Sequence, residues 1–115
     1  MGRVSQNLMA KSPREIAIPA IVLFELEYGI LKSTSPEKRI EQLNALSALV
    51  TLLPFSSYEA KTAAAIRFKL ERTGQLIGLY DILIAAIALQ HNAILVTNNT
   101  REFSRIETLK IEDWY

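Results

Sequence analysis

Residues 81–89 restrict the possible folds more than any other segment, because every side chain after Asp81 in this stretch is apolar. A helix that is apolar almost all round is buried on most of its sides rather than lying on a surface. The run is also far shorter than the roughly 18 apolar residues of a membrane span. The sequence therefore predicts a central helix covered by other elements, with Asp81 as its one charge.

The rest of the chain alternates between short apolar runs and segments with helical spacing. The apolar runs predict buried strands at residues 16–18, 51–53, 93–96 and 109–111, the last at an edge. Helical periodicity and start signals predict helices at 3–11, 20–32, 35–50, 56–72 and 99–105. This alternation predicts one α/β domain over residues 1–115, with a mainly parallel sheet covered on both faces.

Local signals mark several helix boundaries. Pro19 suits the first turn of the helix at 20–32. Ser56 and Glu59 have the spacing of a capping box, and Asn99 and Glu102 repeat that spacing before the short helix at 99–105.

Composition excludes several classes of site. The chain has no cysteine, which rules out disulfides, thiolate zinc sites and cysteine nucleophiles, and one histidine rules out sites that need two imidazoles. Thirteen basic against twelve acidic residues give a net charge of +1, so any nucleic-acid contact must come from a local patch. No secretory signal or membrane span is visible, and we expect a cytoplasmic protein.

Three polar features fall where ligands bind in open α/β sheets, beyond the carboxyl ends of the strands. Glu25 lies in an apolar helical segment about two turns after the first strand, Asp81 opens the buried helix, and residues 97–99 follow the third strand. A carboxylate among apolar neighbours costs several kcal/mol unless a cation or hydrogen bonds satisfy it. Paired carboxylates suit Mg²⁺ or Mn²⁺, which activate water for phosphodiester hydrolysis.

Structural roles compete with this interpretation. Asp81 can complement the dipole of its helix. Glu25 can pair with Arg67, and Asn99 with Glu102 can form a helix cap.

Other polar and aromatic residues also have structural interpretations. We expect His91 to interact with a helix C-terminus, and Tyr28, Phe55 and Phe103 to belong to the core rather than to stack on bases.

Four motifs, in order and with matching spacing, resemble the VapC-type PIN-domain toxins: residues 24–29 (FELEYG), 78–86 (GLYDILIAA), 95–103 (LVTNNTREF) and 111–114 (IEDW). The resemblance implies a Mg²⁺-dependent endoribonuclease, or one using Mn²⁺, that acts on RNA as the toxin of a toxin–antitoxin pair. It also implies silencing by a VapB-type antitoxin, and we expect a homodimer.

The resemblance assigns roles residue by residue. Glu25 corresponds to the family's second acid and Asp81 to its third, and both would hold the metal. Asn99 stands where many relatives carry a fourth acid. Three neighbours are implied to line the site or contact substrate, namely Thr97, Arg101 and Glu102.

One departure from the family pattern bears on activity. The family begins with an apolar strand ending in Leu-Asp-Thr-Asn, whose aspartate is the first metal ligand, and no such motif precedes Glu25. We therefore expect a PIN-like domain truncated at its N-terminus, without the first strand and first aspartate. The alternative function is an inactive remnant that only binds an antitoxin. An in-frame upstream coding stretch for the strand would favour the enzyme.

Overall fold

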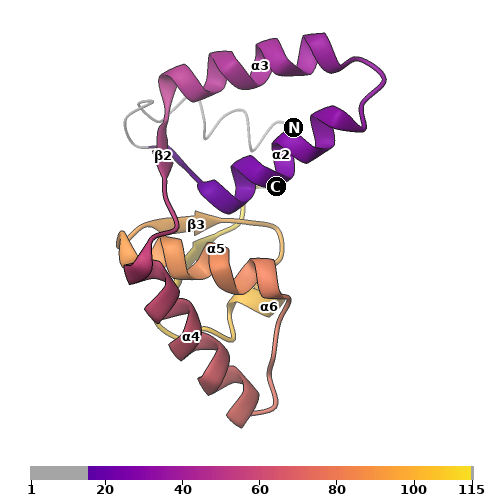
Figure 1. Ribbon diagram of the computed structural model, residues 1–115. Helices are drawn as coiled ribbons and strands as arrows, with labels where there is room; N and C mark the ends of the chain where they lie inside the picture. Colours follow the sequence, from indigo (N-terminus) through magenta and orange to yellow (C-terminus); the bar gives the residue numbers. More distant parts are fainter. Residues whose placement is uncertain (1–15, 115) are drawn as a thin grey trace.

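The structure, a computed structural model, describes residues 16–114 (Figure 1). The helix expected at 3–11 lies outside these residues. In chain order the elements are β1 (Ala17–Pro19), α2 (Ala20–Leu31), α3 (Pro36–Leu49), β2 (Thr51–Leu53), α4 (Ser57–Arg72), α5 (Leu79–Gln90), β3 (Ile94–Val96), α6 (Thr100–Phe103) and β4 (Lys110–Glu112).

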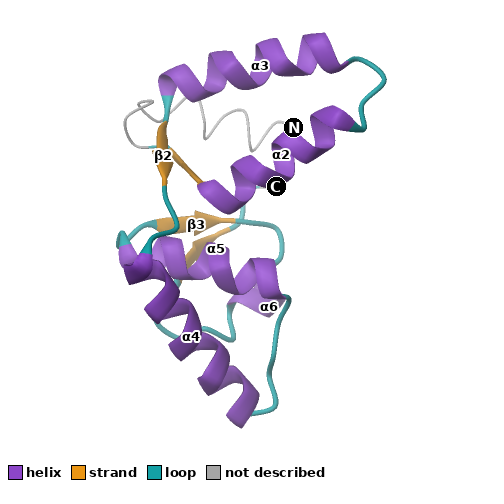
Figure 2. Ribbon diagram, in the orientation of Figure 1, coloured by secondary structure: helices purple, strands orange, loops and turns teal. Residues whose placement is uncertain are grey.

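The strands form two parallel pairs, as Figure 2 shows with its orange arrows. Strand β1 pairs with β2, placing Ile18 beside Leu52, and β3 pairs with β4, placing Leu95 beside Ile111. The expected parallel pairing is confirmed, although within residues 16–114 the sheet consists of two separate pairs. Helix α5 contacts both β1 and β3 and so connects the two pairs.

Helix α5 is the central element that its sequence predicts. Ala85, Ala86 and Ile87 are fully buried, and Ile82 is nearly so. Helix α4 packs along α5, and both contribute to one core with the segment that follows α6. The members of this core outside α5 are Ala63, Ile66, Leu70, Ile77, Phe103, Ile106 and Leu109.

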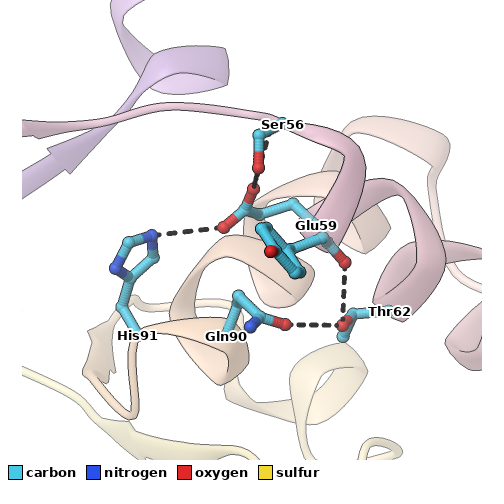
Figure 3. Close-up of polar contacts among 6 residues, drawn as sticks. Ser56, Glu59, Thr62, Gln90 and His91 are labelled. Atoms are coloured by element: carbon cyan, nitrogen blue, oxygen red, sulfur yellow. Dashed lines mark hydrogen bonds and ion pairs between the residues drawn. The ribbon is translucent and has the colours of Figure 1, made fainter.

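Hydrogen bonds and an ion pair connect the start of α4 to the end of α5 (Figure 3). The predicted capping box is confirmed: the Glu59 carboxylate accepts hydrogen bonds from the Ser56 hydroxyl and, at 2.8 Å, from the Ser56 backbone N–H. Glu59 is buried, and its second oxygen lies 3.2 Å from His91 Nε2. The Thr62 hydroxyl also donates to Gln90 Oε1 at 3.0 Å. His91, expected at a helix C-terminus, does follow the last turn of α5.

Helices α2 and α3 stand apart from the body formed by α4 and α5 (Figure 1). Most of α2 is apolar, yet Ile30 is its one buried side chain, and Leu31 is 83% exposed. The radius of gyration is 15.0 Å, whereas a compact domain of this length has about 13 Å. The projecting pair explains the difference.

Pro19 differs slightly from expectation, because it ends β1 instead of lying in the first turn of α2. Its ψ of 145° is extended, so it acts as the N-cap residue of the helix. Across residues 16–114 we find no helix that combines the length and apolar character needed to cross a membrane.

Candidate functional site

One cleft brings together the two acids that the sequence singled out. Glu25 on α2 and Asp81 on α5 both line it, together with Gly78, Leu79 and Tyr80, and its volume is about 350 Å³. Helix α2 follows β1 directly, and Gly78 is the N-cap residue of α5, so two segments far apart in the sequence line the cleft. The two acids therefore share one cleft although they are far apart in the sequence.

Asp81 has the more perturbed environment of the two acids. It lies in the first turn of α5 and is half-buried. Burial raises the pKa of its carboxyl group above the usual range, and the negative charge of Glu102 raises it further. A cation in this cleft would lower the electrostatic cost of the Asp81 charge.

Glu25 lies in a different environment from the one its sequence suggested. Its side chain is exposed, so the predicted cost of burial among apolar neighbours does not apply. Arg67, a possible partner in the sequence, instead lies 3.6 Å from Glu71 on its own helix. Within residues 16–114 Glu25 forms no hydrogen bond or ion pair, and its carboxylate is open to a ligand in the cleft.

The residues after β3 lie next to α6 and do not line this cleft. The Asn99 backbone N–H donates to Thr97 Oγ1 at 3.0 Å, which shapes the turn before α6. Asn99 makes no side-chain cap, so the predicted capping box with Glu102 is wrong. Glu102 acts electrostatically on Asp81, and Arg101 is exposed.

The donors in the cleft fit a hard divalent cation. Glu25 and Asp81 supply oxygen atoms, and Mg²⁺ is commonly bound through one or two carboxylates plus waters. In the described part of the chain, no group of three or more acidic or histidine side chains is placed to hold a metal ion. The arrangement therefore fits a two-carboxylate site with waters completing the coordination.

Two aromatic side chains beside the acids were not identified from the sequence. The rings of Phe24 and Tyr80 contact each other edge to face, with centroids 5.9 Å apart. Each ring belongs to the residue that directly precedes an acid of the cleft. This repeated order, an aromatic residue followed by an acid, is the sequence signal that could have identified the two rings.

Of the three aromatic residues predicted to belong to the core, two pack in or against it and one does not. Tyr28 is 54% exposed, with Lys32 Nζ lying 4.6 Å from its ring centroid, so its prediction as a core residue is wrong. Phe103 is buried as predicted, and Phe55 packs against the core while partly exposed.

Comparisons with a family model and with individual proteins indicate the same family. A PIN-domain model matches residues 2–109. Ribonuclease VapC2 of Rickettsia felis is 41% identical over 108 residues, which cover 94% of this chain and 80% of that protein. The tRNA(fMet)-specific endonuclease VapC of Shigella flexneri is 36% identical over 100 residues, covering 87% of this chain and 76% of that protein.

Solved structures agree with the sequence relatives. The DNA-bound VapBC structure from Salmonella typhimurium contains a chain with a TM-score of 0.90 and 34% identity, covering 98% of this chain and 85% of that one. A chain of VapBC2 from Rickettsia felis, bound to a promoter DNA fragment, has a TM-score of 0.81 and 40% identity, covering 87% of this chain and 75% of that one. The predicted PIN-like α/β fold is confirmed, and the chain belongs to the PIN-domain family with the VapC ribonucleases as its relatives.

Proposed function

We propose that this protein is a Mg²⁺-dependent endoribonuclease and the toxin of a VapBC-type pair. The observation that carries the proposal is the common cleft of Glu25 and Asp81, in a chain whose relatives are named ribonucleases. Glu25 and Asp81 supply the oxygen ligands that a divalent metal ion of this kind requires. The reaction is hydrolysis, in which water adds to phosphorus and one P–O bond of the RNA backbone breaks.

Each proposed site residue takes its role from its place in the motifs shared with the VapC ribonucleases. Glu25 and Asp81 would hold Mg²⁺, or Mn²⁺ in its place. When bound, this ion supplies activation of water and stabilisation of the phosphoryl charge. Thr97 and Asn99, at the carboxyl end of β3, would orient water or a phosphate oxygen.

Two further side chains complete the proposed site. Glu102 would keep negative charge next to Asp81 and so favour a cation there. Arg101 is exposed and carries the fork of donors that binds phosphate oxygens, so it would contact the substrate backbone.

The proposed partners are a VapB-type antitoxin and a second copy of the chain. Both VapBC structures named above pair a similar chain with an antitoxin. The exposed apolar side chains of α2 and α3, which include Leu26, Leu31 and Leu49, provide surface that association would cover.

The test is cleavage of a labelled initiator tRNA, chosen because relatives are named tRNA(fMet)-specific endonucleases. We expect cleavage with Mg²⁺ or Mn²⁺, loss of cleavage in EDTA, and inhibition by the cognate antitoxin. Asp81→Asn should lower the rate at least about tenfold, while the matched control Glu27→Gln, an exposed acid of α2 that does not line the cleft, should cleave normally. Metal-independent cleavage, or full activity of Asp81→Asn, would contradict the proposal.

A second candidate is an inactive module that only binds the antitoxin. The observation that favours it is that residues 16–114 place no third acidic side chain with Glu25 and Asp81 at metal-binding distance. It predicts antitoxin binding without RNA cleavage at any metal concentration, which the same assay measures.

A further inference from the structure

The cleft has aromatic rings on the same two helices that supply its acids. Phe24 precedes Glu25 on α2, and Tyr80 precedes Asp81 on α5. The two ring planes are inclined by 65° with centroids 5.9 Å apart, which is an edge-to-face pair. Tyr80 lines the cleft together with Glu25 and Asp81, and its contact with Phe24 places the second ring next to it.

This aromatic pair is not part of the core. Phe24 is 52% exposed and Tyr80 is 49% exposed, whereas Phe103 in the core is 4% exposed. In an edge-to-face pair the edge of one ring covers one face of the other, and this contact does not cover the remaining ring faces. Leu79, which also lines the cleft, is exposed as well. The molecule thus keeps flat apolar faces in water directly beside two carboxylates.

The charges of the cleft restrict what can bind to those faces. The five residues that line it include two acids and no basic side chain. A phosphate group would be repelled unless a cation is present, so a nucleic acid needs an attraction there that does not depend on charge. Stacking of a base on an aromatic ring is such an attraction, and all four bases have a π face.

We infer that Phe24 and Tyr80 form a stacking platform for one unpaired nucleobase of an RNA substrate, beside the carboxylates that receive its phosphate. This inference rests on the proposed ribonuclease function. A nucleotide joins a planar base to a phosphate, which matches the aromatic–acid arrangement of the cleft. A base inside a duplex is stacked and paired, so the platform selects single-stranded loops or ends.

The test uses a short single-stranded oligoribonucleotide that carries one 2-aminopurine, whose fluorescence falls when the base stacks. We expect the wild-type chain to quench it in the presence of Mg²⁺. Phe24→Leu and Tyr80→Leu should lose quenching and bind roughly tenfold more weakly. The matched controls Phe68→Leu and Tyr58→Leu, which remove rings that are 60% and 67% exposed on α4, should leave both readouts unchanged.

Two conservative variants separate stacking from a general loss of structure. Tyr80→Phe keeps the ring and should keep quenching, and Tyr80→Trp enlarges it and should increase quenching and affinity. If Tyr80→Leu does not fold, the other three variants still test the inference. Stacking predicts different quenching by Tyr80→Phe, Tyr80→Trp and Phe24→Leu, so equal quenching by all three would overturn it. Annealing a complementary strand to the probe should abolish quenching, and undiminished quenching of the duplex would also overturn it.

The remaining outcomes distinguish this inference from the proposed function. Cleavage of RNA without any quenching of the probe would overturn the platform and leave the ribonuclease proposal standing. Quenching without cleavage would support the platform and count against the ribonuclease. If Phe24→Leu and Tyr80→Leu keep normal RNA binding but lose antitoxin binding, the rings form a protein-docking surface and the inference is wrong.

Discussion

Asp81 has a structural position at the start of α5 and a proposed chemical role in the cleft. Its carboxylate lies in the first turn of α5, where the helix dipole favours a negative charge. Burial and the nearby Glu102 charge act against that preference and raise its pKa. A simple helix-capping acid would not need a second acid nearby or a shared cleft with Glu25. The proposed metal-binding role is compatible with the helix-dipole role, because Asp81 also lines the cleft with Glu25.

Glu59 is the buried acid of the described residues, and its protonation should control acid stability. The Ser56 hydroxyl, and then the Ser56 backbone N–H, hold the pKa of the Glu59 carboxyl below its usual value. A lowered folded-state pKa stabilises the fold fully above the unfolded value of about 4.3 and loses this contribution as the pH falls through the folded value. We expect Glu59→Gln to lower Tm at pH 7 and to lose this difference below about pH 4.

Thermal melts over this pH range measure the effect of Glu59. Glu107→Gln is the control, because Glu107 is exposed and paired across the surface with Lys69. A Tm difference for Glu59→Gln that does not change with pH would show that the carboxylate charge is unimportant. Ser56→Ala removes the hydroxyl donor and should cost about 1 kcal/mol.

Ile87 tests the claim that α5 is the centre of the core. Its side chain is fully buried, and truncation of such a side chain to alanine costs about 2–5 kcal/mol. The comparison variant Leu49→Ala, at a position 63% exposed at the end of α3, should change the stability by less than about 0.5 kcal/mol. Urea unfolding measures both, and equal losses would contradict the assignment of the core.

At the scale of elements, local signals predicted most of the fold. The bounds of the strand at residues 51–53 and the capping box before α4 were predicted correctly, and β4 lies one residue later than expected. The predicted burial of the strand at 51–53 is wrong, because Thr51 and Leu52 are exposed. Periodicity, caps and breakers act over a few residues, so a sequence carries them directly. The separation of the strands into two pairs depends instead on contacts between distant segments.

The candidate site was also predictable where local sequence signals specify it, and not where it depends on contacts between distant segments. Asp81 was identifiable because it is the one charge of an apolar helix, and it does line the cleft with Glu25. The exposure of Glu25 and the contact between Phe24 and Tyr80 depend on how α2 meets α5. No local sequence pattern specifies the contact between α2 and α5. The assignment of Thr97, Asn99 and Arg101 to the site remains a prediction.

Helices α2 and α3 should be the least protected elements of the chain alone. Each of them buries a single side chain, Ile30 in α2 and Leu43 in α3, whereas α5 buries six. Local opening has a low free energy where few apolar contacts hold an element. We expect amide hydrogens of α2 and α3 to exchange faster than those of α5, as mass spectrometry of peptic fragments measures. Equal protection of α2 and α5 would contradict this description.

At the scale of the whole molecule, a closed body and a projecting helix pair meet at the cleft. Asp81 belongs to α5, which packs in the core with α4 and the segment after α6, while Glu25 lines the same cleft from α2. The site is therefore only as rigid as the contact between α2 and α5. Anything that holds these helices together, such as a bound cation or a partner chain, should stabilise the folded state through binding.

Calorimetric titration with Mn²⁺ tests most directly whether Glu25 and Asp81 hold one ion. We expect binding by the wild-type chain and affinity at least about tenfold weaker in both Glu25→Gln and Asp81→Asn. If the two acids share the ion, the double variant should lose less than the product of the two single effects. Glu27→Gln should bind as the wild type does. Unchanged Mn²⁺ affinity in both single variants would contradict the shared site and the ribonuclease mechanism built on it.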